Sequence, residues 1–179
     1  MSRWRRLLVL GSTLPALLPG CLGAESARSG WNVCSNPELG FSIEYPPGWY
    51  TTHLEPRTAC LFFDERPFTV PPASELLGTG LAVLPQAQQP FEDVVAGYTD
   101  ERFARVLARE DTEVAGLRAV RLETEATGEG LADRGTLETS YVVERDGSAW
   151  IVQTSSAPGR DYEARQEILD RAAATLRFD

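Results

Sequence analysis

The chain has three cysteines and one histidine, the side chains best suited to act as nucleophile, general base or soft metal ligand. His53 would need a nearby nucleophile or an oriented carboxylate to work as a base, but the sequence has no G-x-S-x-G pattern. Cys34 and Cys60 do not form a C-x-x-C pair, and His53 is the one histidine that could join them as a metal ligand. We therefore predict no catalytic and no metal site, with His53 as a solvent-facing strand residue. A hydrolase that uses His53 with a carboxylate is the enzymatic alternative.

Cofactor motifs are missing from the sequence as well. Acidic residues are plentiful, but none stand in the D-x-D-x-D-G pattern of a calcium loop. Gly128 and Gly130 do not have the spacing of a phosphate-binding loop. We expect no cofactor.

The first 20 residues have the composition of an export signal, and an apolar run follows their basic patch. The basic residues are Arg3, Arg5 and Arg6. At about twelve residues, the run 7–18 is too short to span ~30 Å of hydrocarbon. Residues 18–21, LPGC, are similar to the bacterial lipobox, whose cysteine receives a diacylglyceryl group before the leader is removed. We predict that residues 1–20 are a lipoprotein signal peptide and that Cys21 is acylated. Ordinary secretion with loss of Cys21 is the alternative.

The rest of the chain divides into a tether and one domain. Residues 21–36 are small and polar, which favours a lipidated flexible tether, and residues 37–179 form the domain. Trp31 is unusual in such a tether, and we expect it to fold back onto the domain. Cys34 and Cys60 remain as an even pair in an exported chain and are predicted to form a disulfide. Closing a loop of about 26 residues would stabilise the fold by roughly 3.5 kcal/mol.

The amino-acid composition indicates a globular domain with an excess of acidic residues. Of 179 residues, 42% are hydrophobic and 9% aromatic, which is enough for one domain with a real core. The 26 acidic residues outnumber the 17 basic ones and give a formal charge of −9. A nucleic-acid partner is excluded, because a phosphate backbone would be repelled.

Hydrophobic periodicity predicts the elements of that domain. Period-two alternation and β-type runs predict strands at residues 41–45, 49–52, 59–63, 80–84, 117–127, 136–145 and 148–155. Asp146 and Gly147 have the composition of a tight hairpin turn between the last two strands. Helical periodicity predicts helices over residues 91–109 and 161–176. Antiparallel hairpins with separated helices indicate an α+β fold, an antiparallel sheet flanked by helices.

Three stretches together resemble the PsbP-like domain. They are residues 40–49 (GFSIEYPPGW), the strand entry at residues 116–121 (GLRAVR) and the closing residues 176–178 (LRF). The PsbP-like superfamily groups the extrinsic photosystem protein with the Ran-binding Mog protein and LpqN-type bacterial lipoproteins. The resemblance covers about residues 37–178 and implies an α/β/α sandwich without catalytic activity. The predicted lipoprotein leader fits the bacterial branch, and the photosystem role is not carried over.

One connection has the composition of a recognition loop. Residues 62–72 place apolar side chains and prolines beside Cys60, where a disulfide would hold them on a rigid scaffold. We name Phe68, Val70 and Trp49 as candidate partner-binding residues, although Phe68 and Val70 could instead close the end of the core. The sequence thus predicts a non-catalytic binding or assembly module, lipid-anchored outside the cytoplasm to the bacterial cell membrane. Its partner would be a cell-envelope protein, or, in the alternative, it would carry a lipid or another apolar ligand.

Overall fold

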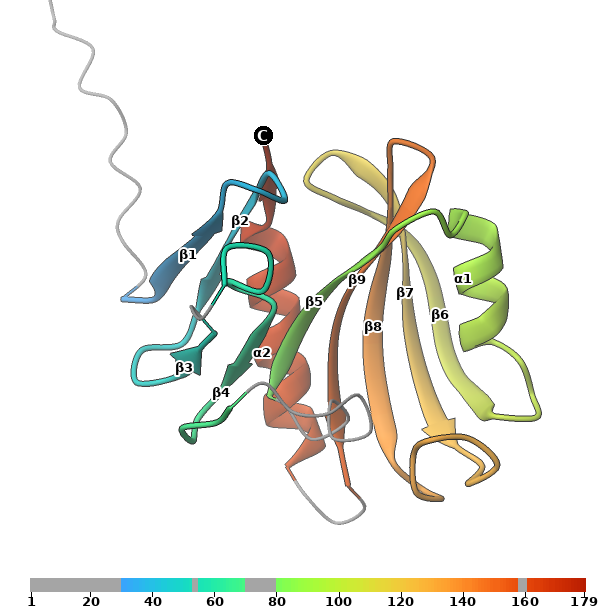
Figure 1. Ribbon diagram of the computed structural model, residues 1–179. Helices are drawn as coiled ribbons and strands as arrows, with labels where there is room; N and C mark the ends of the chain where they lie inside the picture. Colours follow the sequence, from blue (N-terminus) through green and yellow to red (C-terminus); the bar gives the residue numbers. More distant parts are fainter. Residues whose placement is uncertain (1–29, 53–54, 70–79, 158–160) are drawn as a thin grey trace, which may run out of the picture.

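The computed structural model describes residues 30–52, 55–69, 80–157 and 161–179 (Figure 1). These residues form ten strands and two helices. The strands are β1 (Asn32–Asn36), β2 (Phe41–Tyr45), β3 (Tyr50–Thr51), β4 (Phe62–Asp64), β5 (Leu81–Gln86), β6 (Ala104–Val114), β7 (Leu117–Ala126), β8 (Leu137–Arg145), β9 (Ser148–Ser156) and β10 (Arg177–Phe178). The helices are α1 (Phe91–Tyr98) and α2 (Tyr162–Thr175). Neither helix in this described part is long and apolar enough to cross a membrane.

A seven-stranded sheet forms the centre of the molecule. Its strand order is β3-β4-β5-β9-β8-β7-β6, and all of its neighbours are antiparallel. The hairpin between β8 and β9 turns at Asp146 and Gly147, whose φ angles are 51° and 76°. Two consecutive positive φ values are the geometry of the hairpin turn that the sequence predicts at this point.

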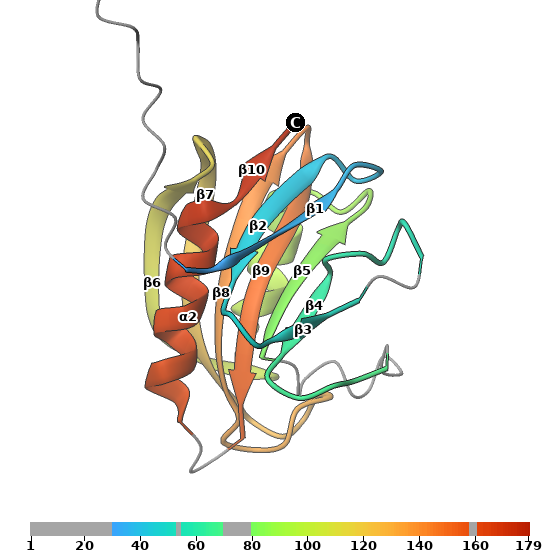
Figure 2. The same cartoon turned by 90° about the vertical axis from the view of Figure 1, so that its left-hand side faces the viewer.

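The helices cover opposite faces of this sheet. Figure 2 shows α2 and a small three-stranded sheet, β1-β2-β10, in front of the large sheet, with α1 behind it. The α+β fold with an antiparallel sheet flanked by helices is thereby confirmed.

Alternation along the central strands divides the core in two, because successive side chains point to opposite faces. On β8, Val143 faces α2 and the small sheet, whereas Val142 faces α1. On β9, Trp150 and Val152 face α2, whereas Ile151 faces α1. Each helix therefore packs on a hydrophobic cluster of its own. Two residues that follow each other on a central strand contribute to different clusters, one on each face of the sheet.

The helix predicted over residues 91–109 is wrong beyond Tyr98. Helix α1 ends there, Asp100 caps the following turn by accepting from the backbone N–H of Arg102 at 3.0 Å, and β6 begins at Ala104. Strand β6 lies at the sheet edge and has a register shift between Val106 and Ala108. The shift disrupts strict alternation, so this strand has no clear period-two pattern.

Ordered structure also begins earlier than the boundary predicted at residue 37. Strand β1, within the range assigned to the tether, pairs with β2 along its whole length, from Asn32 opposite Tyr45 to Asn36 opposite Phe41. Trp31 packs against the core cluster beside α2, with the guanidinium of Arg171 4.2 Å from its ring centroid. The indole thus folds back onto the domain.

Candidate functional site

A cavity of about 550 Å³ lies between α1 and the face of the large sheet that this helix covers. Its walls come from segments far apart in the sequence. They include Leu84 on β5, Val94 on α1, Ala126 on β7, Glu138 on β8 and Ile151 on β9. The volume is in the range of small-molecule binding sites.

The walls and mouth of the cavity are mostly apolar. Val94 and Ile151 are part of the buried cluster beneath α1, and Leu84 packs against that cluster. Phe103 and Leu131 also line the cavity, and they are 43% and 82% exposed. Large apolar side chains so open to water beside a cavity are typical of a binding surface.

The loop that carries Leu131 is held beside the start of β6 by hydrogen bonds. The hydroxyl of Thr127 donates to the carbonyl of Arg102 at 2.7 Å, and the backbone N–H of Thr127 donates to the carbonyl of Phe103 at 3.0 Å. Gly130 lies against the ring of Phe103. The mouth is therefore built from two segments that hold each other in place.

Glu138 is one of the polar residues that line the cavity. The carboxylate of Glu138 accepts a hydrogen bond from the Ser140 hydroxyl at 2.7 Å, and the two residues share one face of β8. Burial raises the pKa of Glu138 above its ordinary value, and the hydrogen bond from Ser140 opposes this shift only in part.

Tyr98, at the end of α1, completes this polar cluster. Its hydroxyl donates to Oε1 of Gln153 at 2.5 Å. Burial strongly raises the pKa of Tyr98, and the nearby negative charge of Glu138 raises it further. Tyr98 therefore stays a neutral phenol and a hydrogen-bond donor at physiological pH.

Side chains on the opposite face of β8 form hydrogen bonds with α2. The Tyr141 hydroxyl donates to Asp170 of α2 at 2.8 Å, and Thr139 and Tyr162 share a hydrogen bond of 2.7 Å. Burial and the carboxylate of Asp170 raise the pKa of Tyr141 to about 12. These contacts fix α2 on the sheet, and the side chains that make them are not part of the cavity beneath α1.

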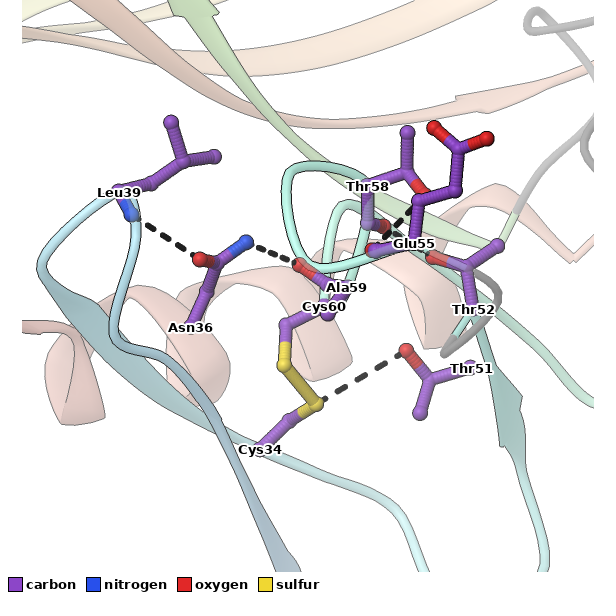
Figure 3. Close-up of a disulfide and its surroundings, with 9 residues drawn as sticks. All are labelled: Cys34, Asn36, Leu39, Thr51, Thr52, Glu55, Thr58, Ala59 and Cys60. Atoms are coloured by element: carbon purple, nitrogen blue, oxygen red, sulfur yellow. Dashed lines mark hydrogen bonds between the residues drawn. A yellow bond between two sulfur atoms is a disulfide. The ribbon is translucent and has the colours of Figure 1, made fainter.

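The predicted disulfide between Cys34 and Cys60 is present, with Cα atoms 5.7 Å apart (Figure 3). Both cysteines are buried in the cluster beneath the small sheet. The side-chain amide of Asn36 donates to the carbonyl of Ala59 at 2.7 Å and accepts from the backbone N–H of Leu39 at 3.0 Å. The disulfide thus lies in a hydrogen-bonded junction between β1 and the segment before β4, and it is structural.

Two of the three candidate partner-binding residues, Trp49 and Phe68, lie within the described residues. Trp49 is partly buried, packs against the core beside Phe63, and lies over Gly80. Phe68 is also partly buried. Val70 lies outside the described residues, as do His53 and Cys21.

Sequence reasoning did not find the cavity or the cluster of Tyr98, Glu138 and Gln153. Alternation on β8 indicates that Glu138, Ser140 and Val142 share a face, but it does not indicate which helix covers that face. Phe103, which is exposed at the mouth, lies within residues 91–109, for which the periodicity predicts a helix. Among the described residues, no group of three or more His, Cys, Asp or Glu side chains is placed to hold a metal ion.

The fold that these elements define is PsbP-like. It is similar to the solution structure of cyanobacterial PsbP (CyanoP) from Synechocystis sp. PCC 6803, with a TM-score of 0.50. The similarity covers 83% of this chain and 92% of that protein, at 15% sequence identity. No protein-family model matches the sequence, and no curated protein matches it. At this identity the likeness establishes the fold alone.

Proposed function

We propose that the chain is a non-catalytic binding module, anchored by lipid at Cys21 outside the cytoplasm, that holds an apolar ligand in the cavity between α1 and the sheet. The observation that carries this proposal is the apolar-walled cavity of about 550 Å³ with exposed Phe103 and Leu131 at its mouth. Burying apolar ligand surface there would supply the binding free energy, at about 25 cal/mol per Å². This develops the carrier alternative that the sequence left open.

The polar groups of the cavity favour binding over catalysis. Nucleophilic catalysis needs a nucleophile bonded to a base that a third group orients. Here the hydroxyl of Ser140 donates to Glu138, whose raised pKa reflects burial, and the hydroxyl of Tyr98 donates to a neutral amide oxygen. Within the described part of the chain, neither hydroxyl belongs to a series of nucleophile, base and orienting group. The PsbP-like fold supports the same reading as an analogy.

A blocked cavity tests the binding role. Gly97 lines the cavity on α1, four residues after Asp93, and a Cβ built there meets no atom within 4 Å. Gly97→Leu would place a side chain toward the cavity, and leucine is a better helix former than glycine by roughly 0.8–1 kcal/mol. Native mass spectrometry of the full chain purified from cells should show a bound small molecule that Gly97→Leu loses.

Ala96→Leu is the matched control, because Ala96 is an exposed neighbour on the same helix that does not line the cavity. It should retain the ligand. A passenger that survives in Gly97→Leu, or turnover in an activity screen that His53→Ala abolishes, would contradict the proposal. The anchor has its own test: labelled palmitate should be incorporated into the wild-type chain and not into Cys21→Ala.

A further inference from the structure

The charges that line the cavity have one sign. Of the described residues that form its walls, the charged ones are Asp93 on α1 and Glu138 on β8, both acidic. The guanidinium of Arg102, beside the Phe103 ring at the mouth, is held by the carboxylate of Asp100, with nitrogen–oxygen distances of 2.5–3.1 Å. The cavity therefore presents negative charge in apolar surroundings.

Glu138 differs from the acidic residues on the neighbouring strands. Glu123 pairs with Arg121, Glu125 pairs with Arg105, and Glu144 on the same strand as Glu138 contacts Arg118. Among the described residues, the structure gives Glu138 no such ion pair, and its recorded side-chain partner is the neutral hydroxyl of Ser140. A carboxyl group in a desolvated place without a positive partner is costly to ionise.

We propose that the cavity binds an organic cation, a protonated amine carried on an aliphatic or aromatic body. The ammonium group would lie at the carboxylate of Glu138, and the body would lie against Val94 and Ile151 with Phe103 at the mouth. This assignment rests on the proposed binding function and names the chemical class of its ligand. Asp93 adds a second negative charge on the helical wall.

Charge complementarity selects the cation over the other ligand classes that would fit an apolar cavity. A fatty carboxylate would bring its negative charge close to Glu138 and Asp93, and like charges at short distance disfavour each other. A neutral alcohol would fill the apolar walls, but it carries no positive charge to compensate the carboxylate of Glu138. An ammonium group compensates it by a charge-assisted hydrogen bond, the strong kind.

The state of Glu138 agrees with this assignment. Burial raises its pKa in the empty protein, and a bound cation would lower the pKa again because it favours the charged form. Binding of the amine should therefore release a proton from Glu138 at pH values between the bound and the free pKa. Binding of an alcohol should not.

Isothermal titration of the full chain with octylamine, octanol and octanoate tests the proposal, because the three probes share one hydrocarbon chain. Octylamine should bind at least about tenfold more tightly than octanol, the ratio that corresponds to 1.4 kcal/mol. Octanoate should bind more weakly than either. Titrations in buffers of different ionisation enthalpy should show proton release with octylamine alone.

Single substitutions test whether the preference for octylamine depends on Glu138. Glu138→Gln should reduce octylamine affinity to that of octanol, whereas Glu144→Gln removes the same charge from the same strand outside the cavity and should leave the affinity unchanged. Gly97→Leu should weaken binding of all the probes. Equal affinity for octylamine in wild type and Glu138→Gln, or octanoate binding as tight as octylamine, would overturn the cation assignment.

The two proposals fail differently. If octanol and octylamine bind equally and Gly97→Leu blocks both, the cavity is a binding site for apolar molecules and the cation assignment alone is wrong. If Gly97→Leu changes the affinity of no probe, the cavity is not the binding site, and the proposed function fails with the inference.

Discussion

The hydroxyl of Tyr98 and Oε1 of Gln153 are 2.5 Å apart, and this hydrogen bond joins the last residue of α1 to the middle of β9. Gln153 is 7% exposed, so the bond is made where water does not compete freely. It holds the C-terminal end of a two-turn helix on the sheet beside the cavity. A helix this short has little stability of its own and depends on such tertiary contacts.

Tyr98→Phe should lower the free energy of unfolding by about 1–3 kcal/mol, because Oε1 of Gln153 would then be buried without its donor. Urea denaturation followed by circular dichroism measures the change. Tyr50→Phe removes the same hydroxyl from an exposed residue and should change stability by less than about 0.5 kcal/mol. Equal effects of the two variants would show that the Tyr98 hydrogen bond contributes nothing specific.

The disulfide should account for a large part of the stability. Cys34 and Cys60 are 26 residues apart in the sequence, and in the chain-entropy model a loop of that length corresponds to about 3.5 kcal/mol. The double variant Cys34→Ser, Cys60→Ser should lose about this much, measured by urea denaturation. Since both cysteines are less than 5% exposed, the native protein should also resist a thiol reductant until it unfolds. A double variant as stable as the wild type would contradict the entropic argument.

Period-two alternation and turn residues in the sequence predict most strands of the large sheet. The hairpin at Asp146 and Gly147 needs residues that tolerate positive φ, and the strands on either side alternate clearly. Strand β6 was missed for a physical reason: it is an edge strand with both faces largely exposed, so burial does not impose a period of two on its sequence. The sequence predicts the link from Cys34 to Cys60 but not strand β1 itself, because the pairing with β2 that defines this strand is a contact between two segments.

The candidate site could not be predicted in the same way. Its components, among them Val94, Phe103 and Glu138, belong to different elements, and their meeting depends on which face of the sheet α1 covers. In the sequence, nothing distinguishes Glu138 from the other acidic residues of the predicted strands. Among the described residues it has no arginine partner, in contrast to Glu123 and Glu125, and this difference is visible only in three dimensions.

Trp49 is expected to be a structural residue, and Gly80 offers a way to test this. A Cβ built at Gly80 would lie 2.6 Å from Cη2 and Cζ3 of the Trp49 indole, closer than packing allows. The backbone of Gly80 cannot shift easily, because its N–H donates to Asp64 at 3.0 Å and its carbonyl accepts from Thr154 at 2.6 Å. Gly80→Ala should therefore cost about 1–3 kcal/mol of stability by overpacking.

The double variant Gly80→Ala, Trp49→Leu should be more stable than the sum of the two single changes predicts, because the smaller side chain makes room for the methyl group. Chemical denaturation of the four proteins gives this coupling energy. Strict additivity would mean that the indole is not held over Gly80. Trp49 would then be open to the partner-binding role that the sequence suggested.

Glu138 should give the protein a pH dependence of a definite sign. Ser140 donates a hydrogen bond to its carboxyl group, Tyr98 lies close enough to be affected by its charge, and Asp93 lines the same cavity. In the part of the chain that the structure describes, Glu138 forms no ion pair with an arginine. Its pKa is raised by burial in the folded protein, so the folded state binds more protons than the unfolded state between the ordinary and the raised value. Stability from this group is thus fully present below the ordinary glutamate pKa and is lost as pH rises through the raised one.

Asp100 acts in the opposite direction and in a different range. Its hydrogen bonds from Arg102 lower its pKa to about 2, so its contribution is lost only as the pH falls toward that value. Urea denaturation across a pH series should therefore show wild-type stability falling, relative to Glu138→Gln, as pH rises above the ordinary glutamate pKa. Glu144→Gln should keep the wild-type profile, because the exposed Glu144 contacts Arg118 outside the cavity. If Glu138→Gln has the same pH profile as the wild type, the carboxyl group of Glu138 is as well solvated in the folded protein as in the unfolded chain, and the desolvated acid that the cation site needs does not exist.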